Sequence, residues 1–346
     1  MMSDFVPGLE LSAAYYGEIV APLVGGIPHS AALIGPGSEV LAFDTERSAD
    51  HDFGPRALVF VAAGEVEAVT AKIAAGLPER FGGYPTVFDY HGSPQPGVLV
   101  CELGPWLHER LGFDPRRAVS PLDWLSAPWQ GLAEITGGQV FHDGLGELEQ
   151  VRQALHWYPT DVWRYVLACQ WRRIAQEEPF VGRCGEVGDE PGSAVVGARL
   201  VREVMRLALL LRRRYPPYAK WLGSAMARVP GTAELTESLR RALQARTWRE
   251  REAGLCAAYT RLAALQNRMN LARPQDEAVR PFFDRPFQVI GGDRFAEALT
   301  AEITDPALRE VAPLGCADQL SDSVDVLTRP ATARAVTAAA HGWTLP

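Results

Sequence analysis

The sequence lacks several features that would assign it to common protein classes. No apolar stretch reaches the roughly 18 residues that a membrane-spanning helix needs. The N-terminal residues show no basic region followed by an apolar core, so no secretory signal is expected. The five cysteines are scattered, without CxxC or Cys/His ligand spacing, which disfavours a zinc site and a disulfide framework. We therefore expect a cytoplasmic protein that does not contact membranes.

Three enzyme signatures are also missing. The segment GPGS at residues 35–38 lacks the lysine of a P-loop, which disfavours an ordinary NTPase. No G-x-S-x-G elbow of a serine hydrolase occurs. The glycine pairs at 82–83 and 291–292 are not followed by a dinucleotide fingerprint, which disfavours a Rossmann oxidoreductase.

The chain has no overall excess of positive charge. Its 346 residues carry a formal net charge of −8, with 47% hydrophobic and 22% charged residues. Proteins that bind a long nucleic acid usually present a basic surface, because they neutralise phosphates. The arginine runs at 172–173, 212–214 and 240–241 are typical of solvated helix faces. A small nucleotide is therefore the expected partner, rather than a long nucleic acid.

Residues 31–60 hold the strongest chemical pattern. An apolar strand ends in the glycine turn that contains Gly37 and Ser38, and eleven residues then separate Ser38 from Asp50. Asp50-His51-Asp52 opens a second apolar segment, and side chains at positions i and i+2 of a strand share one face. Asp50 and Asp52 are thus expected to hold the same Mg²⁺ or Mn²⁺ ions. Gly37 would let backbone N–H groups approach a phosphate, and His51 would be structural.

A metal site for phosphoryl or nucleotidyl transfer usually includes a third carboxylate, which activates the acceptor hydroxyl. Glu102 is the first choice, because it shares a strand face with Val98 and Val100. Asp89, in the preceding apolar segment, is the alternative. Strand register decides between the two, and both stay open at this point.

Length and periodicity predict an α+β protein of two domains. We expect an α/β domain at residues 1–118 with a mixed β-sheet, a mainly helical domain at 119–290, and a C-terminal extension at 291–346 that packs on the body. The expected strands are 30–34, 52–62, 86–90 and 97–103, the last two joined as a hairpin around the turn HGSPQP. The expected helices include 10–24, 65–75, 195–214, 234–245, 248–267 and 294–303.

The helical part offers candidate phosphate and base contacts. Lys220 follows a proline-rich stop after the helix at 195–214, and could reach a β- or γ-phosphate. Tyr218 or Trp221 could stack on a base, and the alternative is an ordinary packing cluster at a helix end. Arg183, in a glycine-rich segment, is a further candidate phosphate contact.

The spacing of Gly37-Ser38 and Asp50-His51-Asp52 after an apolar strand resembles the signature of the DNA-polymerase-beta-type nucleotidyltransferase superfamily. This resemblance covers the first third of the chain. It implies that Gly37 and Ser38 hold a triphosphate, that Asp50 and Asp52 hold metal, and that Glu102 is the third carboxylate. The stretches GLELSAAYY, PFVGRCGEVGDEPGS, RRYPPYAKW and RPFFDRPF resemble an uncharacterised branch, a domain of unknown function.

The expected reaction is the metal-dependent transfer of a nucleoside monophosphate from a nucleoside triphosphate, with ATP favoured, to a hydroxyl of a small molecule. Pyrophosphate is released, and the nucleotide is expected between the first two domains. Two alternatives stay open. One is attachment of the nucleotide to a partner protein, and the other is a catalytically silent nucleotide-binding module.

Overall fold

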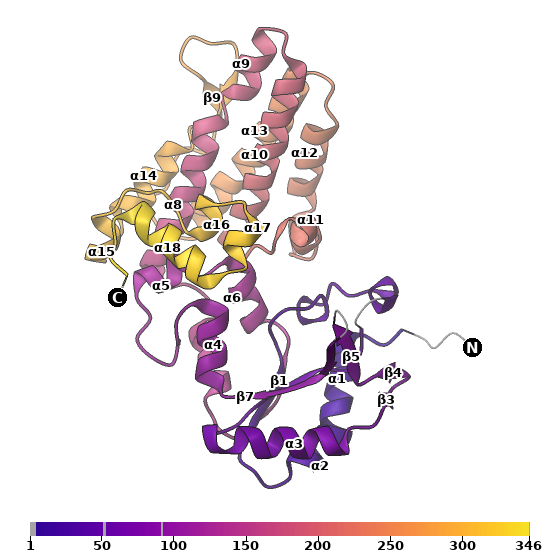
Figure 1. Ribbon diagram of the computed structural model, residues 1–346. Helices are drawn as coiled ribbons and strands as arrows, with labels where there is room; N and C mark the ends of the chain where they lie inside the picture. The colour runs from indigo at the N-terminus through magenta and orange to yellow at the C-terminus, as the bar shows by residue number, and fades with distance from the viewer. Residues whose placement is uncertain (1–4, 51–52, 91–92, 346) are drawn as a thin grey trace. The chain divides into compact units, whose positions relative to one another are not determined.

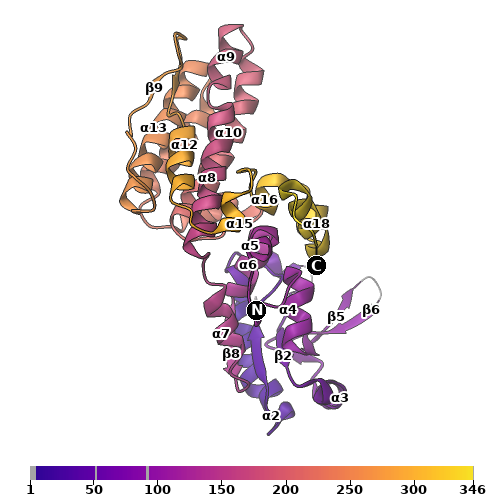
Figure 2. The same ribbon diagram turned by 90° about the vertical axis from the view of Figure 1, so that its left-hand side faces the viewer.

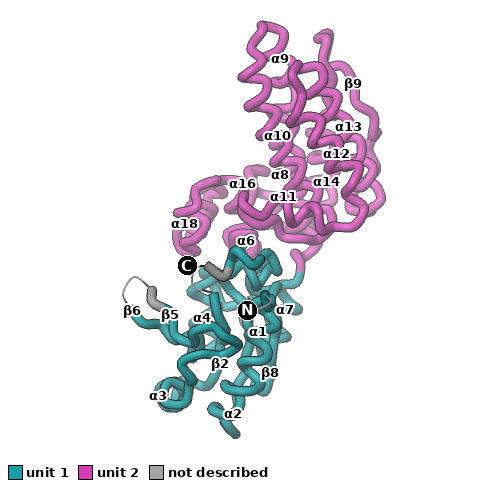
Figure 3. Tube along the Cα trace, turned by 90° about the vertical axis from the view of Figure 1, so that its right-hand side faces the viewer, with its two compact units in different colours: residues 1–119, 130–156 teal, residues 120–129, 157–346 magenta. Residues whose placement is uncertain are grey.

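The computed structural model describes residues 5–50, 53–90 and 93–345. The chain divides into two compact units, coloured separately in Figure 3: unit 1 comprises residues 1–119 and 130–156, and unit 2 comprises residues 120–129 and 157–346. Unit 1 contains a mixed four-stranded sheet and unit 2 is mainly helical, which confirms the α+β class. Residues 130–156, which the sequence assigned to the helical domain, group with unit 1.

The sheet of unit 1 has the strand order β7-β2-β1-β8, and Figure 1 labels β1 and β7 in it. Strand β1 (Ser30–Leu33) runs antiparallel to both β2 (Ala57–Phe60) and β8 (Gln139–Asp143). Strand β7 (Val98–Cys101) lies on the other side of β2 and runs parallel to it. Apolar residues of these strands, among them Ala31 and Val59, pack in one core with residues of α1 and α3.

The predicted helix at 10–24 is present but irregular. It begins as α1 (Gly8–Tyr15), continues as the π-helical segment η1 (Tyr16–Val20) and ends as α2 (Ala21–Val24). The π-turn inserts an extra residue into the helical repeat. Both Tyr15 and Val20 remain buried in the core of the unit.

The predicted strands are present, but one boundary and one pairing are wrong. The predicted strand at 52–62 begins only at Ala57, because Gly54 and Pro55 precede it and a proline has no N–H for a strand ladder. The predicted hairpin between 86–90 and 97–103 is also wrong. Strand β5 (Val87–Tyr90) pairs with β6 (Ser93–Pro96) inside the expected turn, and this hairpin projects from the sheet in Figure 2.

Most of unit 1 is built from short elements around the sheet. Its other elements are the 3₁₀ turns η2 (Glu39–Leu41), η3 (Glu46–Asp50) and η4 (Ala63–Glu65), the helices α3 (Val66–Gly76), α4 (Leu103–Leu111) and α7 (Leu148–Ala154), and the two-residue strands β3 (Arg80–Phe81) and β4 (Tyr84–Pro85). Helix α6 (Trp129–Thr136) begins at the last residue of the 120–129 segment of unit 2.

Unit 2 is organised around three long helices, α8 (Thr160–Glu177), α10 (Glu190–Leu211) and α13 (Trp248–Arg268). Helix α10 begins earlier than predicted, because the side chain of Asp189 accepts the N–H of Gly192 and caps it. The remaining elements are α5 (Pro121–Ser126), α9 (Phe180–Glu186), α11 (Ala219–Ala227), α12 (Ala233–Gln244), β9 (Arg280–Pro281), β10 (Gln288–Val289), α14 (Asp293–Ala301), α15 (Pro306–Arg309), α16 (Ala317–Leu320), α17 (Val324–Leu327) and α18 (Pro330–His341).

Candidate functional site

The glycine turn after β1 has a backbone that only glycine adopts easily. Gly35 has a φ of +89° and Gly37 a φ of +150°. The Gly35 N–H donates a hydrogen bond to the carbonyl of Glu134 at 3.0 Å, and a Cβ on Gly35 would lie 3.2 Å from the ring of Trp106. The hydrogen bond to Glu134 and the close approach of Trp106 therefore fix the position of Gly35.

Strand register brings this turn next to the segment that leads into β2. Ala32 of β1 pairs with Leu58 of β2, so the end of β1 lies beside the beginning of β2. Arg56, one residue before β2, donates from Nη2 to the carbonyl of Pro36 at 3.1 Å. The backbone N–H of Arg56 donates to the hydroxyl of Ser12 in α1 at 3.1 Å. The turn and the residues that follow Asp52 thus meet at one end of the sheet.

An ion pair covers Gly37. The guanidinium of Arg56 donates to the carboxylate of Glu39, which is buried in the 3₁₀ turn η2. A Cβ on Gly37 would overlap the Arg56 guanidinium and would lie 2.8 Å from each Glu39 carboxylate oxygen. Burial lowers the pKa of Arg56 from its ordinary value. Sequence reasoning missed both residues, although a glutamate directly after the turn and an arginine directly before a strand are visible signals.

The turn also carries two polar groups that have no hydrogen-bond partner among the described residues. Ser38 precedes η2, and its hydroxyl makes no capping hydrogen bond to that turn. Within the described ranges, the Gly37 N–H and the Ser38 hydroxyl donate to no other residue. These two groups are therefore open to an acceptor such as a phosphate oxygen.

The predicted metal ligands fall largely outside what the structure describes. Asp50 is the last residue of η3, but its side chain lies outside the described part of the chain, and so does the whole of Asp52. Among the histidines, cysteines and carboxylates of the described residues, no group of three is placed to hold a metal ion. The metal pair Asp50 and Asp52 stays a prediction.

Glu102 is not brought near the glycine turn. Strand β7 is parallel to β2, with Val98 beside Ala57 at the turn end and Cys101 beside Phe60 at the opposite end. Glu102 follows Cys101 and precedes α4. It lies four residues beyond Val98, roughly 13 Å along the strand direction. At the turn end, β7 presents Val98 and the half-exposed Leu99 instead of a carboxylate.

Asp89 lies on a strand near the end of the sheet at which the Gly37 turn lies. A Cβ on Gly54 would lie 2.8 Å from the ring of Phe88 and 2.8 Å from the carbonyl of Pro85, so the chain leading into β5 passes close to the segment before β2. Asp89 follows Phe88 in β5, and its own side chain lies outside the described residues. Of the two predicted third carboxylates, Asp89 is the one whose backbone position agrees with the site.

Lys220 and Arg183 lie at opposite ends of unit 2. Arg183 belongs to α9, before the start of α10, and Lys220 belongs to α11, after the end of α10 (Figure 1). The 22 residues of α10 correspond to a length of about 33 Å. Lys220 lies over the ring of Trp221 at 5.6 Å, and Trp221 packs edge-on against Tyr218. Lys220 and Arg183 are too far apart to bind the same triphosphate.

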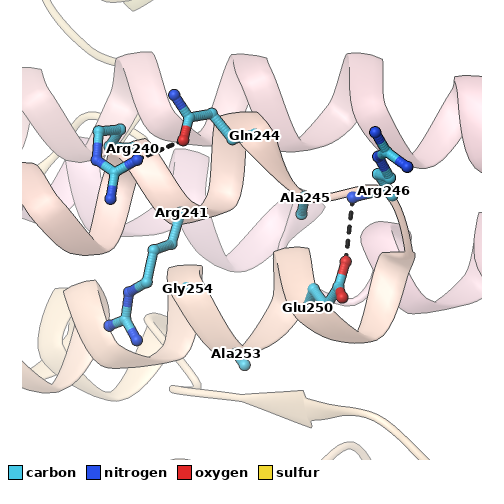
Figure 4. A pocket seen from close by; sticks show the side chains of 8 residues that line it. All are labelled: Arg240, Arg241, Gln244, Ala245, Arg246, Glu250, Ala253 and Gly254. Carbon is cyan, nitrogen blue, oxygen red and sulfur yellow. Dashed lines mark hydrogen bonds between the residues drawn. The ribbon is translucent and has the colours of Figure 1, made fainter.

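Unit 2 has a surface pocket between the end of α12 and the start of α13 (Figure 4). Arg240 donates to Gln244 and pairs with Glu237, and Glu250 accepts the N–H of Arg246. The pocket contains none of the predicted site residues. The arginine run at 240–241 lies on the exposed side of α12, as expected for a solvated helix face.

Comparison with known proteins adds one match. Residues 124–222 match a family described as a domain of unknown function (DUF4037). This match supports the expected resemblance to a domain of unknown function, and it does not include the glycine turn. No curated protein and no solved structure matches the chain. In the part of the chain that the structure describes, no helix combines the length and apolar composition needed to cross a bilayer.

Proposed function

We propose that unit 1 binds a nucleoside triphosphate with Mg²⁺ or Mn²⁺ and transfers its nucleoside monophosphate to a hydroxyl of a small molecule, releasing pyrophosphate. ATP is the favoured nucleotide. The observation that carries this proposal is the pairing of β1 with β2, which puts the Gly37-Ser38 turn beside the residues that lead from Asp50 and Asp52 into β2.

The chemistry of the donors at this end of the sheet suits an anionic ligand with a metal. The Gly37 N–H and the Ser38 hydroxyl are hydrogen-bond donors, and such donors bind phosphate oxygens. The carboxylates of Asp50 and Asp52 are the hard oxygen ligands that Mg²⁺ prefers. When bound, the metal would neutralise charge on the phosphates during attack at phosphorus.

A second candidate function is a catalytically silent nucleotide-binding module. The position of Glu102 removes one of the two candidate third carboxylates, because Glu102 lies at the far end of β7 and Leu99 lies at the near end. The silent module further requires that Asp89 does not activate the acceptor. Such a module would keep the phosphate-binding turn but would lack a group that activates the acceptor hydroxyl. We also propose a cytoplasmic location, because all five cysteines are free.

The test is a screen of the four nucleoside triphosphates with Mg²⁺ or Mn²⁺ against pooled small metabolites, with pyrophosphate release as the measurement. Metal-dependent release that is lost in Asp52→Ala, while that variant still unfolds cooperatively at the same temperature, supports nucleotidyl transfer. Nucleotide binding by calorimetry without any release supports the silent module. Full activity of Asp52→Ala with unchanged metal dependence refutes the assignment.

A further inference from the structure

We propose that Arg56 binds a phosphate of the ligand and that Glu39 is the positioning residue that holds the Arg56 guanidinium over the Gly37 turn. This inference rests on the proposed function, because it concerns the same end of the sheet. It adds a residue that neither the glycine turn nor the Asp50-His51-Asp52 segment contains.

The hydrogen bonds of Arg56 leave part of its guanidinium unused. Both hydrogen bonds of the side chain to described residues, to the Pro36 carbonyl and to the Glu39 carboxylate, are made by Nη2. Within residues 5–50, 53–90 and 93–345, Nε and Nη1 donate to no acceptor. The Arg56 side chain is 33% exposed, and among the described residues neither Nε nor Nη1 is a fully buried polar atom without a partner, so both keep contact with solvent. An arginine can present two parallel N–H groups to one phosphate.

Glu39 fixes where those donors lie. Its side chain is only 10% exposed, and the close approach of Gly8 to its Cβ leaves it little freedom to move. A buried carboxylate is costly without a cationic partner, so the pair with Arg56 is kept and orients the guanidinium. The Arg56 guanidinium thus lies against Gly37 and donates to the carbonyl of Pro36, so it contacts the turn that carries the Gly37 N–H and the Ser38 hydroxyl. These donors could therefore contact one phosphate group together.

A buried ion pair also stabilises a fold, and a single Arg56 substitution would leave Glu39 unpaired. The informative protein is therefore the double variant Arg56→Gln with Glu39→Gln. It replaces the ion pair by a pair of neutral amides that can still hydrogen-bond to each other. It also leaves the net charge unchanged, so that a loss of affinity cannot come from the long-range field of the protein. Arg117→Gln, at an exposed arginine of the same unit, is the matched control for loss of a surface arginine.

Calorimetric titration with inorganic triphosphate in the presence of Mg²⁺ tests the proposal on the full chain. We expect the double variant to bind roughly 10- to 100-fold more weakly than the wild type, which is the usual effect of losing a charge-assisted hydrogen bond. Arg117→Gln should bind as the wild type does, and Arg56→Lys should lie between, because it keeps the charge and loses the second N–H group.

The experiment distinguishes failure of the Arg56 contact from failure of the proposed function. If the wild type binds triphosphate and the folded double variant binds it equally well, Arg56 does not contact phosphate and the proposed function is unaffected. If the wild type binds neither triphosphate nor any nucleoside triphosphate, the proposed function and this inference are both overturned.

Discussion

The carboxylate of Glu178, directly after α8, accepts a hydrogen bond from the backbone N–H of Gly292, directly before α14, at 3.0 Å. The same carboxylate accepts the N–H groups of Ile290 at 2.6 Å and Gly291 at 3.1 Å. One buried side chain thus satisfies three consecutive N–H groups in front of a helix, groups that the helix itself leaves unpaired. Within unit 2, this contact ties the segment before α14 to α8.

Glu178 should make the stability of the protein depend on pH. Burial raises its pKa from the ordinary value of 4.5 to about 7, although the hydrogen bonds from Gly292 and Ile290 oppose the shift. A folded-state pKa above the unfolded value means that the contribution is fully present below about pH 4.5 and is lost as pH rises through 7. Urea denaturation at pH 5 and pH 8 should show the wild type losing stability at pH 8.

The variant Glu178→Gln isolates this effect. Its amide does not titrate, so the part of the pH dependence that comes from Glu178 should disappear. It should also be less stable at pH 5 by about 1–3 kcal/mol, because an amide offers one acceptor oxygen where the carboxyl group offers two. Glu186→Gln, at an exposed carboxylate of α9, should behave as the wild type. An unchanged difference between pH 5 and pH 8 in Glu178→Gln would show that another group titrates.

The buried carboxylate of Glu203 should also make the stability of the protein depend on pH, in the acid range. Its side chain is 2% exposed and pairs with Arg173 at 3.1 Å and with Arg206 at 3.6 Å. Burial raises its pKa, but Arg206 and Arg173 outweigh burial and lower the pKa to about 2. Because the folded-state pKa lies below the ordinary 4.5, the stabilisation is present above pH 4.5 and lost as pH falls toward 2.

Replacing Glu203 by alanine leaves these arginines without their buried partner. Such a change typically costs about 3–5 kcal/mol of unfolding free energy, measurable as a lower urea midpoint at pH 7. Glu237→Ala, which removes the exposed partner of Arg240, is the control and should leave the midpoint unchanged. Equal midpoints for Glu203→Ala and the wild type would mean that the network contributes nothing net.

Gly37→Ala should disturb the turn that we propose binds phosphate. The φ of +150° is unfavourable for alanine, and the new Cβ would overlap the Arg56 guanidinium. We expect a loss of roughly 1–3 kcal/mol of stability and a weaker binding of inorganic triphosphate. Gly64→Ala is a matched control in the same unit, because a Cβ there meets nothing within 4 Å. Thermal unfolding and calorimetry should separate the two variants, and equal triphosphate affinity in both would contradict the role of the turn.

The fold was predictable where local periodicity decides it. The apolar stripe of α10, including Leu200, Val204 and Leu207, is a helical pattern that needs no knowledge of its partners, and all three residues are buried. Strand pairing was less predictable, because β7 pairs with β2 through contacts between residues some forty positions apart in sequence. The alternation of a strand gives its buried face but not its neighbour or its direction.

The candidate site also combines features that local sequence predicts with features that depend on strand pairing. Gly37 and Ser38 were chosen because a turn with a glycine is a local signal, and their part in phosphate binding stays a prediction. The ion pair of Arg56 with Glu39 could not be predicted, because it forms only where β1 and β2 meet, and that depends on strand register. Glu102 was chosen by its strand face, which was a reasonable criterion. The end of the strand on which it lies is decided by the parallel pairing with β2.

The choice between Asp89 and Glu102 can be tested by activity. If the protein transfers nucleotides, Asp89→Asn should lower pyrophosphate release by roughly 100-fold or more, which is typical of losing a general base. Glu102→Gln should leave release unchanged, because that carboxylate lies roughly 13 Å along β7 from the turn end. The two variants lose the same formal charge, so each serves as the control for the other. Loss of activity in Glu102→Gln with full activity in Asp89→Asn would contradict the assignment, and it would require the reaction to take place at the opposite end of the sheet.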